Sequence, residues 1–189
     1  MEVSEKKTSV VSEQEVAAVV RRVLEEFERR QSSVRAPTPA KWPPRRVAIG
    51  ADHGGVMLKD DLVQFLKAKG FEVLDCGTHG KASVDYPDFA AAVGRRVRDG
   101  EAEAGVVIDT VGIGSAMAAN KIAGVRCALC HDVATVLNSR LHNDANVLSL
   151  GAQVVPASLA RRMVDLWLGT EFGGERHLRR VKKIRELDG

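Results

Sequence analysis

From Arg46 onward, short apolar runs alternate with longer amphipathic stretches. Uninterrupted β-branched runs predict strands buried on both faces, and apolar positions three or four residues apart predict helices. The predicted strands are Val47–Gly50, Phe71–Asp75, Gly105–Ile108, Val125–Cys130 and Val147–Ser149. The predicted helices span residues 56–69, 87–99, 115–121, 132–141, 156–168 and 176–187. Repeated strand–helix units imply an α/β fold, so we expect residues 46–189 to form a three-layer α/β/α, Rossmann-like domain with a five-stranded parallel sheet.

Residues 1–31 follow a different pattern. Ser12 and Glu15 match a capping box, S-x-x-E, which marks the start of a helix. Apolar residues then recur on one helical face, at Val16, Val20, Val23, Leu24 and Phe27. These features predict an N-terminal amphipathic helix. Residues 32–45 hold four of the six prolines and predict an extended, semi-rigid Pro-rich linker.

The distribution of charged residues along the chain indicates which class of partner the protein binds. Of the 28 Lys and Arg residues in this chain of 189 residues, ten lie in residues 1–46, together with seven of the 25 Asp and Glu residues. The rest of the chain is therefore neutral. This balance argues against nucleic acid as a partner, because nucleic-acid affinity comes largely from neutralising phosphates. The sequence has no run of about 18 apolar residues, so it predicts no membrane-spanning helix.

The number of cysteines indicates the redox state of the protein's cellular compartment. The chain has three, Cys76, Cys127 and Cys130, and a small, odd number favours a reducing compartment over a disulfide framework. Cys127 and Cys130 form a CxxC pair within a predicted strand, where buried thiols are favoured over metal ligands or a redox pair. The N-terminus lacks the apolar core of a secretory signal. We therefore expect a cytoplasmic protein.

The segment Val106–Lys121, VVIDTVGIGSAMAANK, joins a buried strand to a Gly-rich turn and a helix of small residues. Asp109 ends the strand, at the edge of a parallel sheet where α/β proteins bind ligands. Gly112 and Gly114 allow a tight turn and close approach to a ligand. The first N–H groups of the helix favour an anion or a developing oxyanion. The segment is a candidate catalytic site, although such turns also serve for packing.

Three further polar clusters flank predicted strands. Asp52 and His53 follow the first strand, and Tyr86 closes the loop after the second. His142 and Asn143 precede the fifth strand. We expect all three clusters to meet Asp109 in one site at the carboxyl ends of the strands.

Five ordered motifs carry a resemblance to a known family. They are GADHGG, VDYPDFA, the GxGxxxAANK turn, SRLHNDANVLSLG and GGERHLRRV. Over residues 46–185 the chain closely resembles the ribose-5-phosphate isomerase B family, which includes galactose- and allose-6-phosphate isomerases. The resemblance implies aldose–ketose isomerisation of a phosphorylated small sugar through an enediolate, with no metal or other cofactor. It also implies a homodimer or tetramer in which neighbouring subunits share sites.

The same resemblance suggests a role for each matching residue. His142 would be catalytic in ring opening, with Asn143 nearby. Phosphate would be bound by His53, Arg176 and Arg180, and the sugar hydroxyls by Asp52 and Tyr86. The enediolate oxygen would be held by backbone N–H groups of the turn, at Thr110, Gly112, Gly114 and Ser115.

Each role has a simpler alternative. His53 could cap the following helix, Tyr86 could be an aromatic at the edge of the core, and Arg176 and Arg180 could form a solvated basic face. For His177, surface or packing is the default interpretation.

Four positions depart from the family pattern. The usual catalytic cysteine corresponds to Asp109, and the glutamate of another branch corresponds to Ser115. A common Thr or Ser corresponds to Val111, and an arginine after the fifth strand corresponds to Gln153. Two hypotheses follow: an isomerase with Asp109 as an unusual catalytic base, or a non-catalytic relative that binds a sugar phosphate or serves as a scaffold.

The N-terminal helix and its linker also resemble a known arrangement. Encapsulation peptides, which direct enzymes into bacterial microcompartments, are short amphipathic helices on flexible linkers. The resemblance implies a shell protein as a partner and the microcompartment lumen as a location. Packing on the chain's own domain and self-pairing as a short coiled coil are the alternatives.

Overall fold

The computed structural model describes Arg22 and residues 42–188. The predicted N-terminal helix and most of the predicted linker therefore lie outside the described residues. The described residues from Trp42 onward belong to one compact unit, to which the following description applies. No helix among the described residues is long and apolar enough to cross a membrane.

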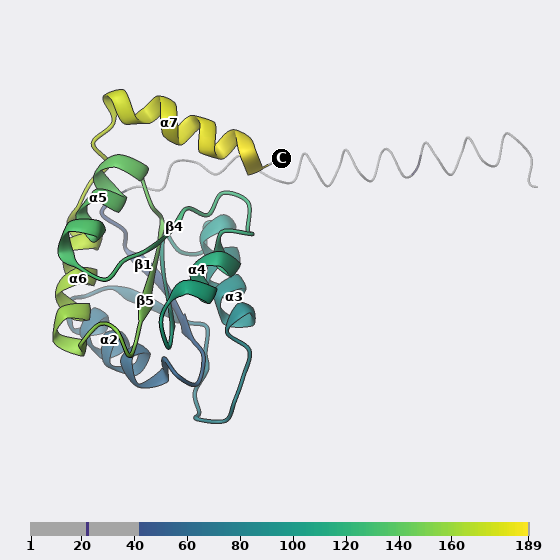
Figure 1. The fold of residues 1–189 in the computed structure, drawn as a ribbon, viewed down its shortest axis with the longest axis vertical. Coiled ribbons are helices and arrows are strands. Elements are labelled where there is room, and N and C mark those ends of the chain that lie inside the picture. The colour runs from purple at the N-terminus through teal and green to yellow at the C-terminus, as the bar shows by residue number, and fades with distance from the viewer. Residues whose placement is uncertain (1–21, 23–41, 189) are drawn as a thin grey trace, which may run out of the picture. The chain divides into compact units, whose positions relative to one another are not determined.

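The predicted five-stranded parallel sheet is confirmed (Figure 1). Its strands are β1 (Arg46–Ala51), β2 (Glu72–Asp75), β3 (Ala104–Asp109), β4 (Cys127–Leu129) and β5 (Val147–Gly151). The strand order is β2-β1-β3-β5-β4, and every neighbouring pair is parallel. The central strand β3 pairs with β1 and β5, and all six of its residues are buried. This accounts for its unbroken apolar sequence.

The helices form a layer on each face of the sheet (Figure 1). These helices are α2 (Val56–Ala68), α3 (Tyr86–Arg98), α4 (Ile113–Ala119), α5 (Val133–Asn143) and α6 (Ala157–Gly169). Helix α7 (Glu175–Arg185) lies at one end of the domain and is followed by the 3₁₀ helix η1 (Glu186–Asp188). One core packs α2, α5 and α6 against the sheet, and the other packs α3 and α4. Alternate strand residues divide between them, because successive side chains of a strand point to opposite faces. Ile108 thus belongs to the first core and Val107 to the second.

The edge strand β4 is shorter than expected. It covers Cys127–Leu129 rather than Val125–Cys130, and it pairs with β5 alone. Cys130 is buried and Cys127 is half-buried, and burial raises the pKa of both thiols. Both thiols are therefore protonated and unreactive at neutral pH.

Trp42, in the last part of the predicted linker, packs against the domain. Its ring meets that of Trp167 edge-on, with centroids 5.4 Å apart. The guanidinium of Arg140 lies 3.5 Å from the centre of the Trp42 ring. The domain therefore starts before Arg46, the predicted boundary.

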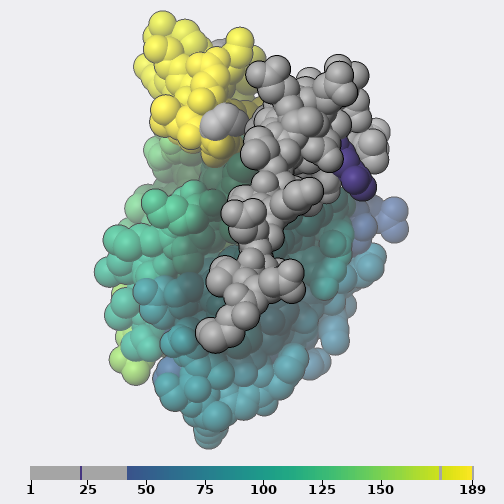
Figure 2. Space-filling view, turned by 90° about the vertical axis from the view of Figure 1, so that its right-hand side faces the viewer, coloured from purple at the N-terminus to yellow at the C-terminus, as the bar shows by residue number. Residues whose placement is uncertain are grey.

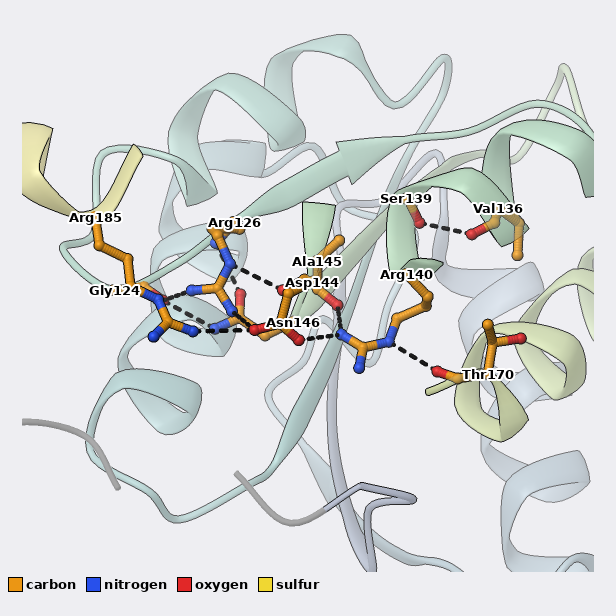
Figure 3. Close-up of polar contacts among 10 residues, drawn as sticks. All are labelled: Gly124, Arg126, Val136, Ser139, Arg140, Asp144, Ala145, Asn146, Thr170 and Arg185. Atoms are coloured by element: carbon orange, nitrogen blue, oxygen red, sulfur yellow. Dashed lines mark hydrogen bonds and ion pairs between the residues drawn. The ribbon is translucent and has the colours of Figure 1, made fainter. Parts of the chain in front are cut away.

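The carboxylate of Asp144 joins three separate parts of the chain (Figure 3). It pairs with Arg126 before β4 at 2.9 Å, with Arg140 in α5 at 3.0 Å and with Arg185 in α7 at 3.0 Å. The side chain of Arg140 is 2% exposed and that of Arg126 is 12% exposed, whereas that of Arg185 is 46% exposed. The two buried guanidinium groups therefore depend most on this carboxylate.

We predict that Asp144→Asn lowers the free energy of unfolding by about 3 kcal/mol, because it leaves two buried charges without an anion. Asparagine tolerates the left-handed backbone at this position, where φ is 50°, so the charge is the main change. The matched control, Arg185→Ala, removes an exposed pair and is expected to cost less than about 1 kcal/mol. Urea unfolding measures both. Equal losses in the two variants would contradict the prediction.

Candidate active site

The carboxyl ends of β1 and β3 bring the first group of predicted residues together. Asp52 follows β1, is buried, and accepts a hydrogen bond from the N–H of Gly55 at 2.9 Å. Thr110 follows β3. Gly54 fits tightly beside both, since a Cβ added to it would lie 2.5 Å from Thr110 Oγ1 and 3.3 Å from Asp52 Oδ1. Glycine at this position therefore lets the two polar side chains lie close together.

Tyr86 and His53 link the loop before α3 to this edge. A Cβ added to Gly114 would lie 2.5 Å from the Tyr86 ring, so Tyr86 covers the start of α4. His53 Nδ1 accepts a hydrogen bond from the N–H of Val84 at 3.2 Å. Helix α2 has Gly55 as its N-cap residue and no side-chain cap, so the alternative role of His53 as a cap does not apply. With Nδ1 as an acceptor, the neutral imidazole carries its proton on Nε2.

The carboxylate of Asp109 accepts hydrogen bonds from backbone N–H groups of its own turn. Oδ1 accepts the N–H of Val111 at 2.8 Å and the N–H of Gly112, and Oδ2 accepts the N–H of Ser115 at 2.9 Å. Gly112 makes the curl possible, because its φ of 86° is in the left-handed region. The buried carboxylate therefore acts as an internal anion for the turn.

These hydrogen bonds set the acidity of Asp109. Burial raises its pKa, but the hydrogen bonds from Ser115, Gly112 and Val111 outweigh burial and hold the pKa below its ordinary value. Asp109 is therefore ionised at neutral pH and is a weak base. A carboxylate has about four lone-pair positions, and three backbone N–H groups occupy most of them here. The N–H groups of Gly112 and Ser115, expected to hold an enediolate oxygen, are donated to Asp109 instead.

The remaining predicted residues lie at the opposite edge of the sheet. His142 and Asn143 end α5, directly before Asp144, which pairs with Arg126 at the start of β4. Asn146 accepts the N–H of Gly105 at the start of β3, at 2.9 Å. We expected this cluster at the carboxyl edge with Asp52. It lies at the amino edge because it precedes a strand rather than following one, and the two edges are about 16 Å apart along β3.

Arg176 and Arg180 lie on α7, which packs beside α5 at the amino edge. A backbone hydrogen bond connects the two helices: Gly173, just before α7, donates its N–H to the carbonyl of Leu141 in α5 at 3.0 Å. Both arginines are exposed, and Figure 2 shows α7 in yellow at one end of the domain. The basic residues and His142 thus form one group, called here the amino-edge cluster.

His177 belongs to this cluster, although we expected no functional role for it from the sequence. Its ring stacks on that of His142, with centroids 4.1 Å apart and planes 10° from parallel. The signal in the sequence was its place directly after Arg176.

As for metals, no group of three or more His, Cys, Asp or Glu side chains in the described part of the chain could hold an ion.

Comparison with known proteins covers the whole domain. The model of the Ribose/Galactose Isomerase family matches residues 47–184. Ribose-5-phosphate isomerase B of Escherichia coli is 41% identical over 144 residues, 76% of this chain and 97% of the relative. A D-erythrulose-4-phosphate isomerase of Pectobacterium atrosepticum is 36% identical over 140 residues, 73% of this chain and 91% of the relative.

Solved structures agree. Ribose-5-phosphate isomerase B of Clostridium thermocellum is 50% identical and superposes with a TM-score of 0.75, covering 76% of this chain and 97% of that one. The chain therefore belongs to the ribose/galactose isomerase family of sugar-phosphate isomerases.

Proposed function

We propose that this chain is a metal-independent aldose–ketose isomerase that converts ribose 5-phosphate into ribulose 5-phosphate through an enediolate. The observation that carries the proposal is the group of Asp52, His53, Tyr86 and Thr110 beside the Asp109 turn. These side chains offer hydrogen-bond partners for sugar hydroxyls around one buried anion. Family membership supports the reaction class, and relatives named for ribose and erythrulose phosphates support a short sugar phosphate.

We propose further that two copies share each site. The amino-edge cluster lies about one strand length from Asp109, too far to meet the same small sugar within one chain. An apolar surface beside the Asp109 turn suits a second copy: Val111, Ile113 and Met117 are 42%, 48% and 64% exposed. In a homodimer or tetramer, the amino-edge cluster of one copy would complete the carboxyl edge of the next.

In this arrangement the two edges have different tasks. Arg176 and Arg180, one helical turn apart, bind the phosphate of the substrate together with His53 from the other copy. His142 exchanges protons as the sugar ring opens. Asp109 then moves a proton between C1 and C2, and to accept that proton it must give up one of its present hydrogen bonds.

The hydrogen bonds of Asp109 favour a second candidate function. A carboxylate with a lowered pKa that already accepts three backbone N–H groups is poorly suited to remove a proton from carbon. The second candidate is a relative that binds a phosphorylated sugar without turning it over, or that serves as a scaffold.

The first test is turnover of ribose 5-phosphate by the purified full chain with EDTA present. We predict that turnover persists in EDTA and that Asp109→Asn lowers kcat by about 10²–10⁴-fold, the usual contribution of a positioned base. Asp109→Cys should retain more turnover than Asp109→Asn, because a thiol with a pKa near about 8.5 forms a stronger base.

Isothermal titration with the same sugar phosphate is the companion measurement, and urea unfolding confirms that the variants fold. Binding without turnover in the unmodified chain would reject the isomerase in favour of the binding function. Equal turnover in the unmodified chain and Asp109→Asn would remove Asp109 from the chemistry.

If two copies share each site, two variants that are inactive alone should recover turnover when they form a mixed dimer. Asp109→Asn and His142→Ala change opposite edges, so a mixed dimer contains one intact site and one doubly changed site. Co-expression at equal levels should restore about one quarter of normal turnover, since half of the dimers are mixed and half of their sites are intact. Failure to recover activity in an isolated mixed dimer would show that each copy builds its own site.

For the N-terminal segment, we propose a role in directing the protein to the lumen of a bacterial microcompartment through a shell protein. A variant without residues 1–38 is expected to keep its fold and turnover, because Trp42 and its contacts with Trp167 remain. The same variant should no longer co-purify with shells. Retention of the truncated protein by purified shells would contradict this role.

A variant without residues 1–45 is the matched comparison for that truncation. It removes Trp42 as well, so it should unfold at lower urea than the shorter truncation.

A further inference from the structure

The stacked rings of His142 and His177 hold two helices together at the amino edge. His142 is in the last turn of α5, and His177 is in the first turn of α7. Their separation of 4.1 Å and angle of 10° place the two rings face to face. The hydrogen bond between Gly173 and Leu141 fixes the backbones beside them. Val181, one turn further along α7, is buried, so α7 is seated on the domain at this point.

Each ring also has a hydrogen-bond partner of its own. His177 Nε2 lies 3.2 Å from Arg176 Nε, and because arginine can only donate, this nitrogen carries no proton. His142 Nδ1 lies 2.9 Å from the amide nitrogen of Asn138, which is also a donor. Arginine therefore makes Nε2 of His177 an acceptor. With the Asn138 amide nitrogen as donor, the matching tautomer of His142 carries its proton on Nε2.

The charges around His177 maintain this state. Burial, together with His142 from α5 and Arg176 and Arg180 from α7, lowers the pKa of His177. A charged His177 would place a cation against the face of His142, next to two arginines. The stack thus keeps a neutral ring on one face of His142.

We propose that His177 is a positioning residue that holds the His142 ring in a single orientation for opening the sugar ring. The inference rests on the proposed isomerase function and on the role of His142 in it. Ring opening moves one proton from the anomeric hydroxyl to the ring oxygen, while the bond between C1 and the ring oxygen breaks and the C1 carbonyl forms. His142 donates the proton on Nε2 to the ring oxygen, solvent water takes the proton of the anomeric hydroxyl, and a proton from solvent then restores Nε2.

The choice of substrate separates this role from simple packing. Ribose 5-phosphate exists mainly as a closed ring and must be opened. Erythrose 4-phosphate carries its phosphate on the oxygen that would close a five-membered ring, so it is already open. Loss of positioning at His142 should therefore slow turnover of the pentose and spare turnover of the tetrose.

We expect His177→Ala to lower kcat for ribose 5-phosphate by about 10- to 100-fold, the scale of a catalytic group that is no longer held in place. Turnover of erythrose 4-phosphate should change less than about twofold. His177→Phe, which keeps a flat ring on His142, should restore most of the pentose turnover. The control is Leu178→Ala, the exposed neighbour on the same helix. Equal losses with both sugars would overturn the proposal in favour of packing.

A second measurement does not depend on activity. The ¹⁵N shifts of the imidazole nitrogens report which nitrogen of His142 carries the proton. We expect a single form protonated at Nε2 in the unmodified chain and in Leu178→Ala. A mixture is expected in His177→Ala, because a freed ring leaves the amide of Asn138. An unchanged His142 signal in His177→Ala would overturn the proposal, whether or not the unmodified chain turns over a sugar.

Discussion

All five strands run in the same direction, so each strand must be followed by a segment that returns the chain to the starting edge of the sheet. This constraint separates the polar residues into two groups. Residues that follow strands, such as Asp52 and Asp109, collect at the carboxyl edge. Residues that precede strands, such as His142, collect at the amino edge. A small substrate that needs both groups requires two copies of the domain, and this is why the proposed chemistry and the proposed assembly depend on each other.

The Asp109 turn shows how one residue can alter a site without altering the fold. The glycine backbone at Gly112 curls the N–H groups inward, and in this chain a carboxylate occupies the space that they enclose. The turn is therefore ordered before any ligand arrives. The same hydrogen bonds that order it weaken Asp109 as a base. Stability of the turn and reactivity of the carboxylate thus oppose each other.

Much of the fold could be predicted from the sequence, because the apolar runs of β1, β3 and β5 are unbroken and helical spacing marks α2 and α6. The carboxyl-edge residues could be found for the same reason, since each directly follows a strand. The place of His142 could not be predicted in this way, because it depends on which end of β5 its polar cluster adjoins. The hydrogen bonds of Asp109 and the stack of His177 depend on backbone directions and on contacts between distant helices. Residue spacing does not contain that information.

Trp42 has a further consequence, through its packing between Trp167 and Arg140. It closes the domain at the amino edge, directly before β1 begins. Everything that carries the proposed chemistry lies after this residue in the chain. A different leading segment can therefore be joined ahead of Trp42 without removing any residue that packs in the domain.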